Sequence, residues 1–250
     1  MVSNKNILIA QGGGPTNVIN QSLVGIIRQE KKYKSKILGS INGVNGIINN
    51  RFISLNKISE NDLKTIANTP GAALGSTRDK PDKKYCKEIL KILENKQISK
   101  FYYIGGNDSS DSLRIISEYA KDTKYKLQCI HIPKTIDNDL VCNDHTPGFG
   151  SAAKYVAQLF SGINYDVKSL PGVYLGIVMG RHAGFLTAAS SLLKKENDDG
   201  PNLIYIPESP FEMNTFLNQV KSIFNKYGRC VIAISEGIQD KNKKLISQKI

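Results

Sequence analysis

The stretch Pro133-Lys134-Thr135-Ile136-Asp137-Asn138-Asp139 decides how the rest of the chain is interpreted. It follows an apolar run over residues 127–132, which predicts a buried strand. The polar residues therefore lie where a strand opens into a loop, the end of an α/β sheet at which ligands bind. Two carboxylates, an Asn, a Thr and a Lys in one stretch suit the handling of a phosphate, a metal ion and a hydroxyl proton together. The alternative is a polar turn whose Asp and Asn side chains only bond their own backbone.

Two glycine-rich turns precede this stretch, and each joins a predicted strand to a predicted helix. Gln11-Gly12-Gly13-Gly14-Pro15-Thr16 follows a strand over residues 5–10 and leads into helical spacing over residues 17–30. Gly105-Gly106-Asn107-Asp108-Ser109 follows a strand over residues 101–104 and opens a second helix. Such turns let backbone N–H groups approach a phosphate, so two of them in one sheet can converge on one polyphosphate. A tight turn and a helix cap at Ser109 would explain the same residues without any ligand.

Strands and helices alternate along the whole chain. Further strands are predicted over residues 36–41, 172–179, 203–206 and 230–235, and helices after Ser59, from Pro81, over 151–160, after Gly184 and over 210–227. Residues 197–200 are expected to form an exposed acidic turn. The alternation predicts an α/β fold with two Rossmann-like, three-layer α/β/α domains and mostly parallel sheets covered on both faces. We expect the domain boundary near residue 145, giving domains 1–145 and 146–250.

Composition limits the classes of partner. The 250-residue chain has a net charge of +12, but its lysines are spread along the sequence, which indicates solvated faces rather than a nucleic-acid-binding patch. The excess positive charge favours small anionic substrates. No apolar run is long enough to cross a membrane, and the N-terminus lacks the pattern of a signal peptide. The four scattered cysteines form no metal-type pair and indicate reduced thiols in the cytoplasm.

Six motifs in a fixed order resemble those of the 6-phosphofructokinases. They are Gln-Gly-Gly-Gly-Pro-Thr-Asn-Val-Ile-Asn (11–20), Gly-Ser-Thr-Arg (75–78), Gly-Gly-Asn-Asp-Ser (105–109), Pro-Lys-Thr-Ile-Asp-Asn-Asp (133–139), Met-Gly-Arg-His-Ala-Gly (179–184) and Ser-Glu-Gly (235–237). Within that family the chain resembles the pyrophosphate-dependent branch. The resemblance implies phosphoryl transfer from pyrophosphate to the 1-hydroxyl of fructose 6-phosphate in glycolysis. It also implies Mg²⁺ as the cofactor and a homo-oligomeric assembly.

The resemblance assigns roles to individual residues. The catalytic residues that it implies are Asp137, Asp108 and Lys134, with Asp137 as the general base on the sugar hydroxyl. The substrate contacts that it implies are Thr135, Ile136, Asp137, Met179, Gly180, Arg181 and Glu236. The phosphoryl-donor contacts are Gly13, Gly14, Arg78 and Ser109, and the metal-binding residues are Asn107, Asp108 and Asp139. The domain over residues 1–145 would bind the donor, and residues 146–250 would bind the sugar phosphate.

Two positions favour pyrophosphate over ATP as the donor. Asp108 and Lys134 both stand where ATP-dependent members of the family have Gly. Asp108 would crowd and repel the α-phosphate of a nucleotide, which pyrophosphate lacks. Lys134 adds a positive charge beside the transferred group. Asn107 is neutral where the family usually has an Asp, so Mg²⁺ would depend more on the substrate phosphates and the remaining carboxylates.

The family pattern continues past residue 250, into segments with a His-Gln-Arg-Gly-Gly-like motif that binds the sugar 6-phosphate. We therefore expect the second domain to be incomplete at its C-terminus and residues 1–250 alone to have little activity. An ATP-dependent 6-phosphofructokinase and a non-catalytic truncated chain remain as alternatives. The stretch over residues 133–139 argues against a third alternative, a different small-molecule kinase such as an NAD kinase.

Overall fold

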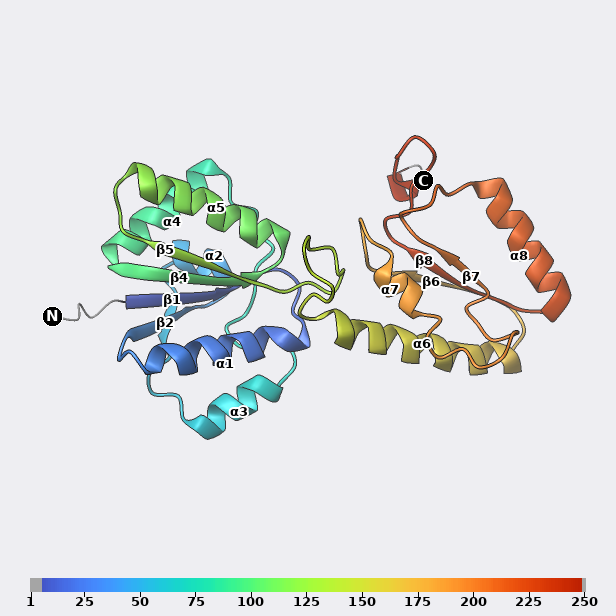
Figure 1. Cartoon of the computed structure of the whole chain (residues 1–250), viewed down its shortest axis with the longest axis horizontal. Helices are drawn as coiled ribbons and strands as arrows, with labels where there is room; N and C mark the ends of the chain where they lie inside the picture. Colours follow the sequence, from blue (N-terminus) through green and yellow to red (C-terminus); the bar gives the residue numbers. More distant parts are fainter. Residues whose placement is uncertain (1–5, 249–250) are drawn as a thin grey trace. The chain divides into compact units, whose positions relative to one another are not determined.

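The structure, a computed structural model, describes residues 6–248 and divides into two compact units, Met1–Lys134 and Thr135–Ile250 (Figure 1). The boundary follows Lys134 directly, whereas the sequence pattern placed it near residue 145. Hydrogen bonds within the second unit explain the difference. The Thr135 N–H donates to the Pro147 carbonyl at 3.1 Å, and the Thr146 hydroxyl donates to the Thr135 carbonyl at 2.8 Å. The loop after the boundary is thereby tied to the segment that opens the next helix.

Unit 1 contains a five-stranded sheet in the order β3-β2-β1-β4-β5. Its strands are β1 (Asn6–Gln11), β2 (Lys36–Ser40), β3 (Phe52–Ser54), β4 (Ile98–Gly105) and β5 (Gln128–Pro133). Four strands are parallel, and β3 pairs with β2 in the antiparallel direction. The sheet is therefore mixed, with one short edge strand that the sequence pattern did not predict. Because Ile53 and Ser54 are exposed, no buried apolar run marks β3.

Helices cover both faces of this sheet and give the predicted three layers (Figure 1). The helices are α1 (Asn17–Lys31), α2 (Gly43–Ile48), α3 (Glu60–Asn68), α4 (Lys83–Asn95) and α5 (Asn107–Asp122). One core joins α1 and α3 to the sheet through buried Leu23, Ile27 and Leu63. The other core joins α4 and α5 to the opposite face through Ile89 and Ile116. Apolar side chains at helical spacing therefore fix which face each helix covers.

Capping side chains set where two of these helices begin. The Ser59 hydroxyl accepts the Asp62 N–H at 3.1 Å, which confirms the cap predicted for α3. In α4 the cap is Asp82, whose carboxylate accepts the Tyr85 N–H at 2.8 Å. The sequence pattern had predicted Pro81 as the first helical residue. That prediction was wrong, because Pro81 precedes the cap. An Asp satisfies an N–H of the first turn, which Pro cannot do.

Unit 2 contains a three-stranded parallel sheet in the order β6-β8-β7. The strands are β6 (Val173–Val178), β7 (Leu203–Tyr205) and β8 (Cys230–Ser235), and the helices are α6 (Phe149–Ser169), α7 (Phe185–Ala189) and α8 (Met213–Tyr227). A 3₁₀ turn, η1, spans Ile246–Gln248. One core packs α6 and α7 on β6 and β8, and a smaller one gathers around Phe211, Ile234 and Ile238.

Two expectations for unit 2 are corrected by the structure. The outer face of β6 is uncovered, with Val173, Leu175 and Ile177 exposed by 54%, 45% and 72%. The acidic turn at residues 197–200 is not exposed throughout, because Asp199 is buried. Its carboxylate accepts the N–H groups of Lys195 and Glu196 at 2.9 and 3.0 Å, so the residue holds the turn together.

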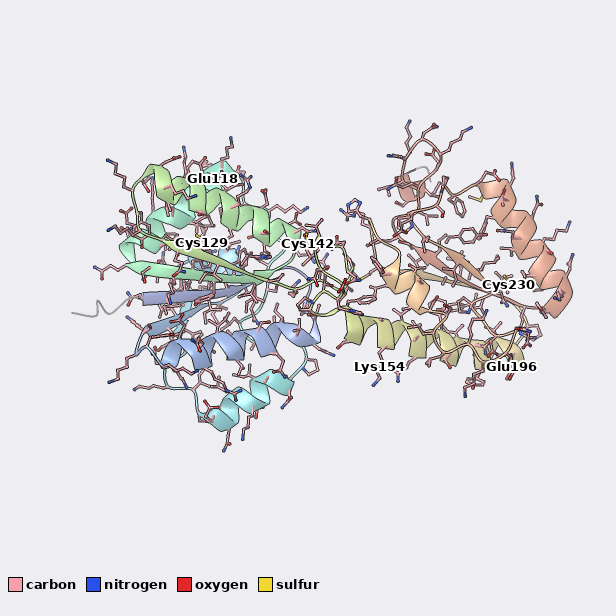
Figure 2. All side chains as sticks on the ribbon, in the orientation of Figure 1. Glu118, Cys129, Cys142, Lys154, Glu196 and Cys230 are labelled. Carbon is pink, nitrogen blue, oxygen red and sulfur yellow. The ribbon has the colours of Figure 1, made fainter. Side chains whose placement is uncertain are left out.

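No helix within residues 6–248 combines the length and the apolar character that a membrane crossing requires. All four cysteines are free thiols. Of the three labelled in Figure 2, Cys129 lies on β5, Cys142 in the loop before α6 and Cys230 on β8.

Candidate active site

The glycine turn after β1 is fixed by backbone bonds to two neighbouring segments of unit 1. The Gly12 N–H donates to the Ile104 carbonyl at 2.8 Å. The Gly13 N–H donates to the Thr77 carbonyl at 2.8 Å, and the Ser76 hydroxyl donates to the Gly13 carbonyl at 2.6 Å. The predicted donor-binding turn and the Gly-Ser-Thr-Arg loop therefore lie side by side.

Two cations flank this turn. Lys134 is only 5% exposed, and its Nζ lies 3.1 Å from the point where a Cβ on Gly13 would stand. An Arg78 guanidinium nitrogen lies 4.0 Å from the corresponding point on Gly14. The Lys134 N–H also donates to the Gly105 carbonyl at 3.0 Å, which joins β5 to the second glycine turn. Positive charge beside a glycine turn favours a phosphate ligand.

Asn107 and Asp108 form the exposed head of α5. The Asp108 carboxylate pairs with the Lys80 ammonium at 3.1 Å, and both side chains are mostly exposed. Such an open pair contributes little to stability. The sequence analysis did not predict Lys80, because its partner Asp108 is distant in the sequence.

Ser109 packs against the first glycine turn from within the unit. It is buried and shares a hydrogen bond with Tyr103. Burial raises the pKa of Tyr103 to about 12, and the bond with Ser109 opposes part of that rise. A Cβ on Gly12 would meet the Tyr103 hydroxyl at 2.6 Å and the Ser109 Oγ at 2.7 Å. The structure thus gives Ser109 a packing role, and its contact with the phosphoryl donor stays a prediction.

In unit 2, the loop with the two aspartates is held by its middle residue. Asn138 is buried in a left-handed conformation with φ of 58°, and its Oδ1 accepts the Thr146 N–H at 2.8 Å. The Asp137 N–H donates to the Thr135 hydroxyl at 3.1 Å. Asp137 and Asp139 flank Asn138 and are both half-buried. The loop is therefore a bonded turn that holds two carboxylates at fixed places.

The loops after β6 and β8, which are neighbouring strands, are also bonded to each other. The Gly180 N–H donates to the Glu236 carboxylate at 3.3 Å, and the Ser235 hydroxyl donates to the Gly180 carbonyl at 2.6 Å. Gly180 has a φ of 133°, which only glycine adopts readily. Met179 and Arg181 are exposed on either side of it. The sugar-phosphate contacts predicted at these positions thus come from one bonded pair of loops.

Ile136 differs from the other predicted contacts because its side chain packs on the core beneath α6 and α7. It anchors the aspartate loop to the same core that carries β6 and β8, and its contact with substrate stays a prediction.

The predicted residues therefore form two groups, one in each unit. The unit 1 group is Gly13, Gly14, Arg78, Asn107, Asp108, Ser109 and Lys134, and the unit 2 group is Thr135, Ile136, Asp137, Asp139, Met179, Gly180, Arg181 and Glu236. Most of these residues follow strands β1, β4, β5, β6 and β8, whereas Arg78 lies in the loop between α3 and α4. Their roles were predicted from the resemblance to the 6-phosphofructokinases.

The described residues contain no cluster of three or more His, Cys, Asp or Glu side chains placed to hold a metal ion. The head of α5 offers one amide oxygen, from Asn107, and one carboxylate, from Asp108. Mg²⁺ prefers such oxygen ligands and usually takes only one or two from the protein, with water and phosphates supplying the others. This donor set fits a magnesium ion that arrives with a polyphosphate.

Relatives of known name share both the sequence and the fold. The pyrophosphate–fructose 6-phosphate 1-phosphotransferase of Rhodospirillum rubrum is 56% identical over 98% of this chain and 61% of its own. The protein of the same name from Xanthomonas campestris is 40% identical with the same coverage. A solved pyrophosphate-dependent phosphofructokinase from Marinobacter aquaeolei matches 95% of this chain and 62% of its own, with 36% identity and a TM-score of 0.84.

The chain thus spans about 61% of the length of the curated relatives that it matches. The sequence profile described as Phosphofructokinase matches residues 6–250, which is nearly the whole chain. On that match the chain belongs to the phosphofructokinase family.

Proposed function

We propose that this protein transfers a phosphoryl group from pyrophosphate to the 1-hydroxyl of fructose 6-phosphate, giving fructose 1,6-bisphosphate and phosphate. Two features together carry the proposal: a buried Lys134 ammonium beside Gly13, and an exposed Asp108 at the head of α5. The names of the two curated relatives support the same reaction. We further propose that the enzyme works in glycolysis, in the cytoplasm, and as a homo-oligomer.

The group in unit 1 suits a small, highly charged donor. Phosphoryl transfer depends on positioning and charge neutralisation more than on covalent catalysis. Lys134 and Arg78 supply two cations at the glycine turns, where N–H groups also favour an anion. Asp108 would oppose the α-phosphate of a nucleotide by size and charge. Pyrophosphate has no such group and is therefore the donor that this arrangement favours.

The group in unit 2 suits the sugar phosphate. Asp137 would accept the proton of the 1-hydroxyl as that oxygen attacks phosphorus. The new O–P bond forms as the bridging P–O bond of pyrophosphate breaks, and phosphate leaves with the electron pair. Arg181 would bind a phosphate oxygen, and Glu236 would accept a hydrogen bond from a sugar hydroxyl.

Asn107 and Asp108 would hold Mg²⁺ together with the donor phosphates, and the metal-binding role that the resemblance implies for Asp139 in unit 2 stays a prediction. When bound, the ion neutralises charge on the phosphate oxygens.

Donor choice tests the proposal most directly. The expected result is turnover with pyrophosphate and little with ATP, measured by a coupled assay in the presence of fructose 6-phosphate and Mg²⁺. Asp108→Gly should raise the activity with ATP relative to pyrophosphate. Asp111→Gly makes the same change one turn further along the exposed side of α5 and should leave the preference unchanged. Equal use of ATP and pyrophosphate by the unaltered protein would refute the exclusion argument.

A further inference from the structure

His131 on β5 has a role that the motifs do not assign. Its ring Nε2 lies 3.0 Å from the Gly105 carbonyl oxygen. Because that oxygen can only accept, Nε2 must carry the hydrogen and donate it. The Lys134 N–H donates to the same oxygen at 3.0 Å. Two donors, His131 on β5 and Lys134 directly after it, therefore hold the Gly105 carbonyl toward that strand.

The orientation of this carbonyl fixes the direction of the next amide. In a trans peptide the C=O and the following N–H point in opposite directions. The Gly106 N–H must therefore point to the other side of β4, where β1 is the neighbouring strand. On that side the Ile104 carbonyl accepts the Gly12 N–H at 2.8 Å. The Gly106 N–H thus faces the glycine turn that carries Gly12 and Gly13.

A side-chain bond is needed at this place because the peptide has little stiffness of its own. Gly105 and Gly106 both lack a Cβ, so the peptide between them rotates more easily than others do. Gly106 is the N-cap of α5 and, as a glycine, has no side chain of its own that could bond to the N–H groups of the first turn. The bond from His131 adds a restraint at this peptide.

We propose that His131 is a positioning residue, whose Nε2–H holds the Gly105 carbonyl toward β5 and so presents the Gly106 N–H to the pyrophosphate. The identity of the ligand rests on the proposed function. The geometry of the bond, the peptide and the two glycine turns is independent of it.

The protonation state of His131 agrees with this role. Burial lowers the pKa of the imidazole, and the nearby Lys134 ammonium lowers it further, against the opposing effect of the backbone bonds. The ring is therefore neutral at pH 7 with its single hydrogen on Nε2. Protonation in acid adds a hydrogen to Nδ1 and does not remove the one on Nε2, so the bond survives across the neutral range.

Binding of pyrophosphate with Mg²⁺, measured by titration calorimetry on the 250-residue chain at pH 7.5, tests the proposal without requiring turnover. His131→Leu removes the donor and should weaken binding by about tenfold, the effect expected for one hydrogen bond that serves a charged ligand. His131→Gln can again offer an N–H and should restore most of the affinity.

Tyr125→Phe is the matched control for stability. The Tyr125 hydroxyl donates to the Leu93 carbonyl at 3.1 Å, just before β5 begins and so at the other end of the sheet. Its loss should lower the melting temperature and leave pyrophosphate affinity unchanged. Equal weakening of affinity by Tyr125→Phe and His131→Leu would overturn the positioning role.

Amide hydrogen exchange gives a second readout. Pyrophosphate should slow exchange of the Gly106 N–H in the unaltered chain and should slow it much less in His131→Leu. The proposal is overturned by an unaltered chain that does not bind pyrophosphate, or by a Leu variant that binds it equally tightly. If the His131 effect is present but a chain extended by the family's C-terminal segment does not phosphorylate fructose 6-phosphate, the proposed function is refuted and the positioning role stays supported.

Discussion

Gly12 leaves no room for a methyl group. An added Cβ would lie 2.6 Å from the Tyr103 hydroxyl and 2.7 Å from the Ser109 Oγ, and these two buried groups are bonded to each other. Gly12→Ala should therefore break that bond or displace the turn. We expect a loss of roughly 1–3 kcal/mol in the free energy of unfolding, as for other overpacked cores. Chemical denaturation followed by circular dichroism would measure it.

Gly25→Ala is the control for this change. Gly25 lies in α1, and nothing stands within 4 Å of its added Cβ. Alanine is the better helix former, so this variant should gain up to about 1 kcal/mol. A loss of similar size in both variants would mean that the space at Gly12 is not the cause.

In a full-length context, Asp137→Asn should lower turnover by on the order of a hundredfold or more and leave substrate binding largely intact. An amide keeps the shape of the side chain, and the backbone bond from the Asp137 N–H to the Thr135 hydroxyl is unchanged. The amide cannot, however, accept the hydroxyl proton. Steady-state kinetics would separate kcat from KM for fructose 6-phosphate. Wild-type turnover in the variant would remove Asp137 from the mechanism.

Motif residues were predictable at this scale because they follow strands, and the ends of strands are visible in the apolar pattern. Lys134 and Asp137 stood out in this way, whereas Gly180 was predicted only through the resemblance to the 6-phosphofructokinases. His131 and Lys80 were not, because each acts through a partner that is distant in the sequence: the Gly105 carbonyl for His131 and Asp108 for Lys80. No spacing rule brings such pairs together before the fold is known.

At the scale of elements, a polar network ties the long helix α6 to the turn before β7. The Asp199 carboxylate accepts the Lys168 ammonium at 2.6 Å and the Asn164 amide at 2.9 Å, and both partners come from α6. The Asn164 Oδ1 accepts the Gly200 N–H at 2.8 Å. The bond from Lys168, followed by those from backbone N–H groups, holds the pKa of Asp199 well below its usual range.

Asp199→Asn should destabilise unit 2, by roughly 1–3 kcal/mol, because an amide nitrogen would face donors that now bond to a carboxylate. The folded-state pKa of Asp199 is depressed, so its contribution is complete above the ordinary aspartate pKa. That contribution is lost as the pH falls below the ordinary value and toward the folded one. The gap in melting temperature between wild type and variant should therefore be widest near pH 7 and shrink near pH 3.

Asp198→Asn provides the comparison. Asp198 is 39% exposed at its side chain and pairs with Arg229 and Lys168. Because solvent screens such a pair, its replacement should have a smaller effect. Equal losses in the two variants at pH 7, or a gap for Asp199→Asn that does not change with pH, would contradict the account of this network.

Regular elements were easier to predict than irregular ones. Strands β1, β4 and β8 were found because their apolar runs are largely buried in the sheet. Strand β5 was also found, but the prediction that it is buried was wrong, since its residues are exposed or only partly buried. Two short elements, α2 and β3, were missed because neither carries a full period of apolar spacing. Helix α7 ends at Ala189, so Leu192 and Leu193 lie beyond it and are exposed, although their spacing continues the helical pattern. There, spacing alone cannot tell a helix from the turn after it.

At the scale of the whole molecule, the two units differ in how well they cover their sheets. In unit 1, buried side chains pack helices on both faces of five strands. In unit 2, Ile238 and Ile246 after β8 add to the small core around Phe211, although the sequence there is polar and rich in lysine. The outer face of β6 receives no such cover. The sequence predicted the opposite, because residues 173–178 form an apolar run broken only by Gly176, and such a run is typical of a strand covered on both faces.

The exposed face of β6 should make the polypeptide of residues 1–250 prone to self-association. Val173, Leu175 and Ile177 form a row of apolar side chains, and β6 pairs on only one side in the described sheet. An apolar row on an edge strand presents both apolar surface and unpaired backbone groups to other chains. We expect the polypeptide to bind a hydrophobic dye such as ANS and to sediment as a mixture of species at micromolar concentration.

Ile177→Lys places a charge at the most exposed position of this row and should reduce both dye binding and association, because charged residues on edge strands oppose pairing. Val141→Lys is the matched control, since Val141 is 89% exposed in a loop of the same unit and lies outside the row. It adds the same charge, so any general effect of net charge on association would appear in both variants.

Sedimentation velocity at two salt concentrations would compare the two variants, because salt screens the charge but does not cover the apolar row. A monomeric parent without dye binding, or equal improvement by the two lysines, would show that the β6 face does not drive association.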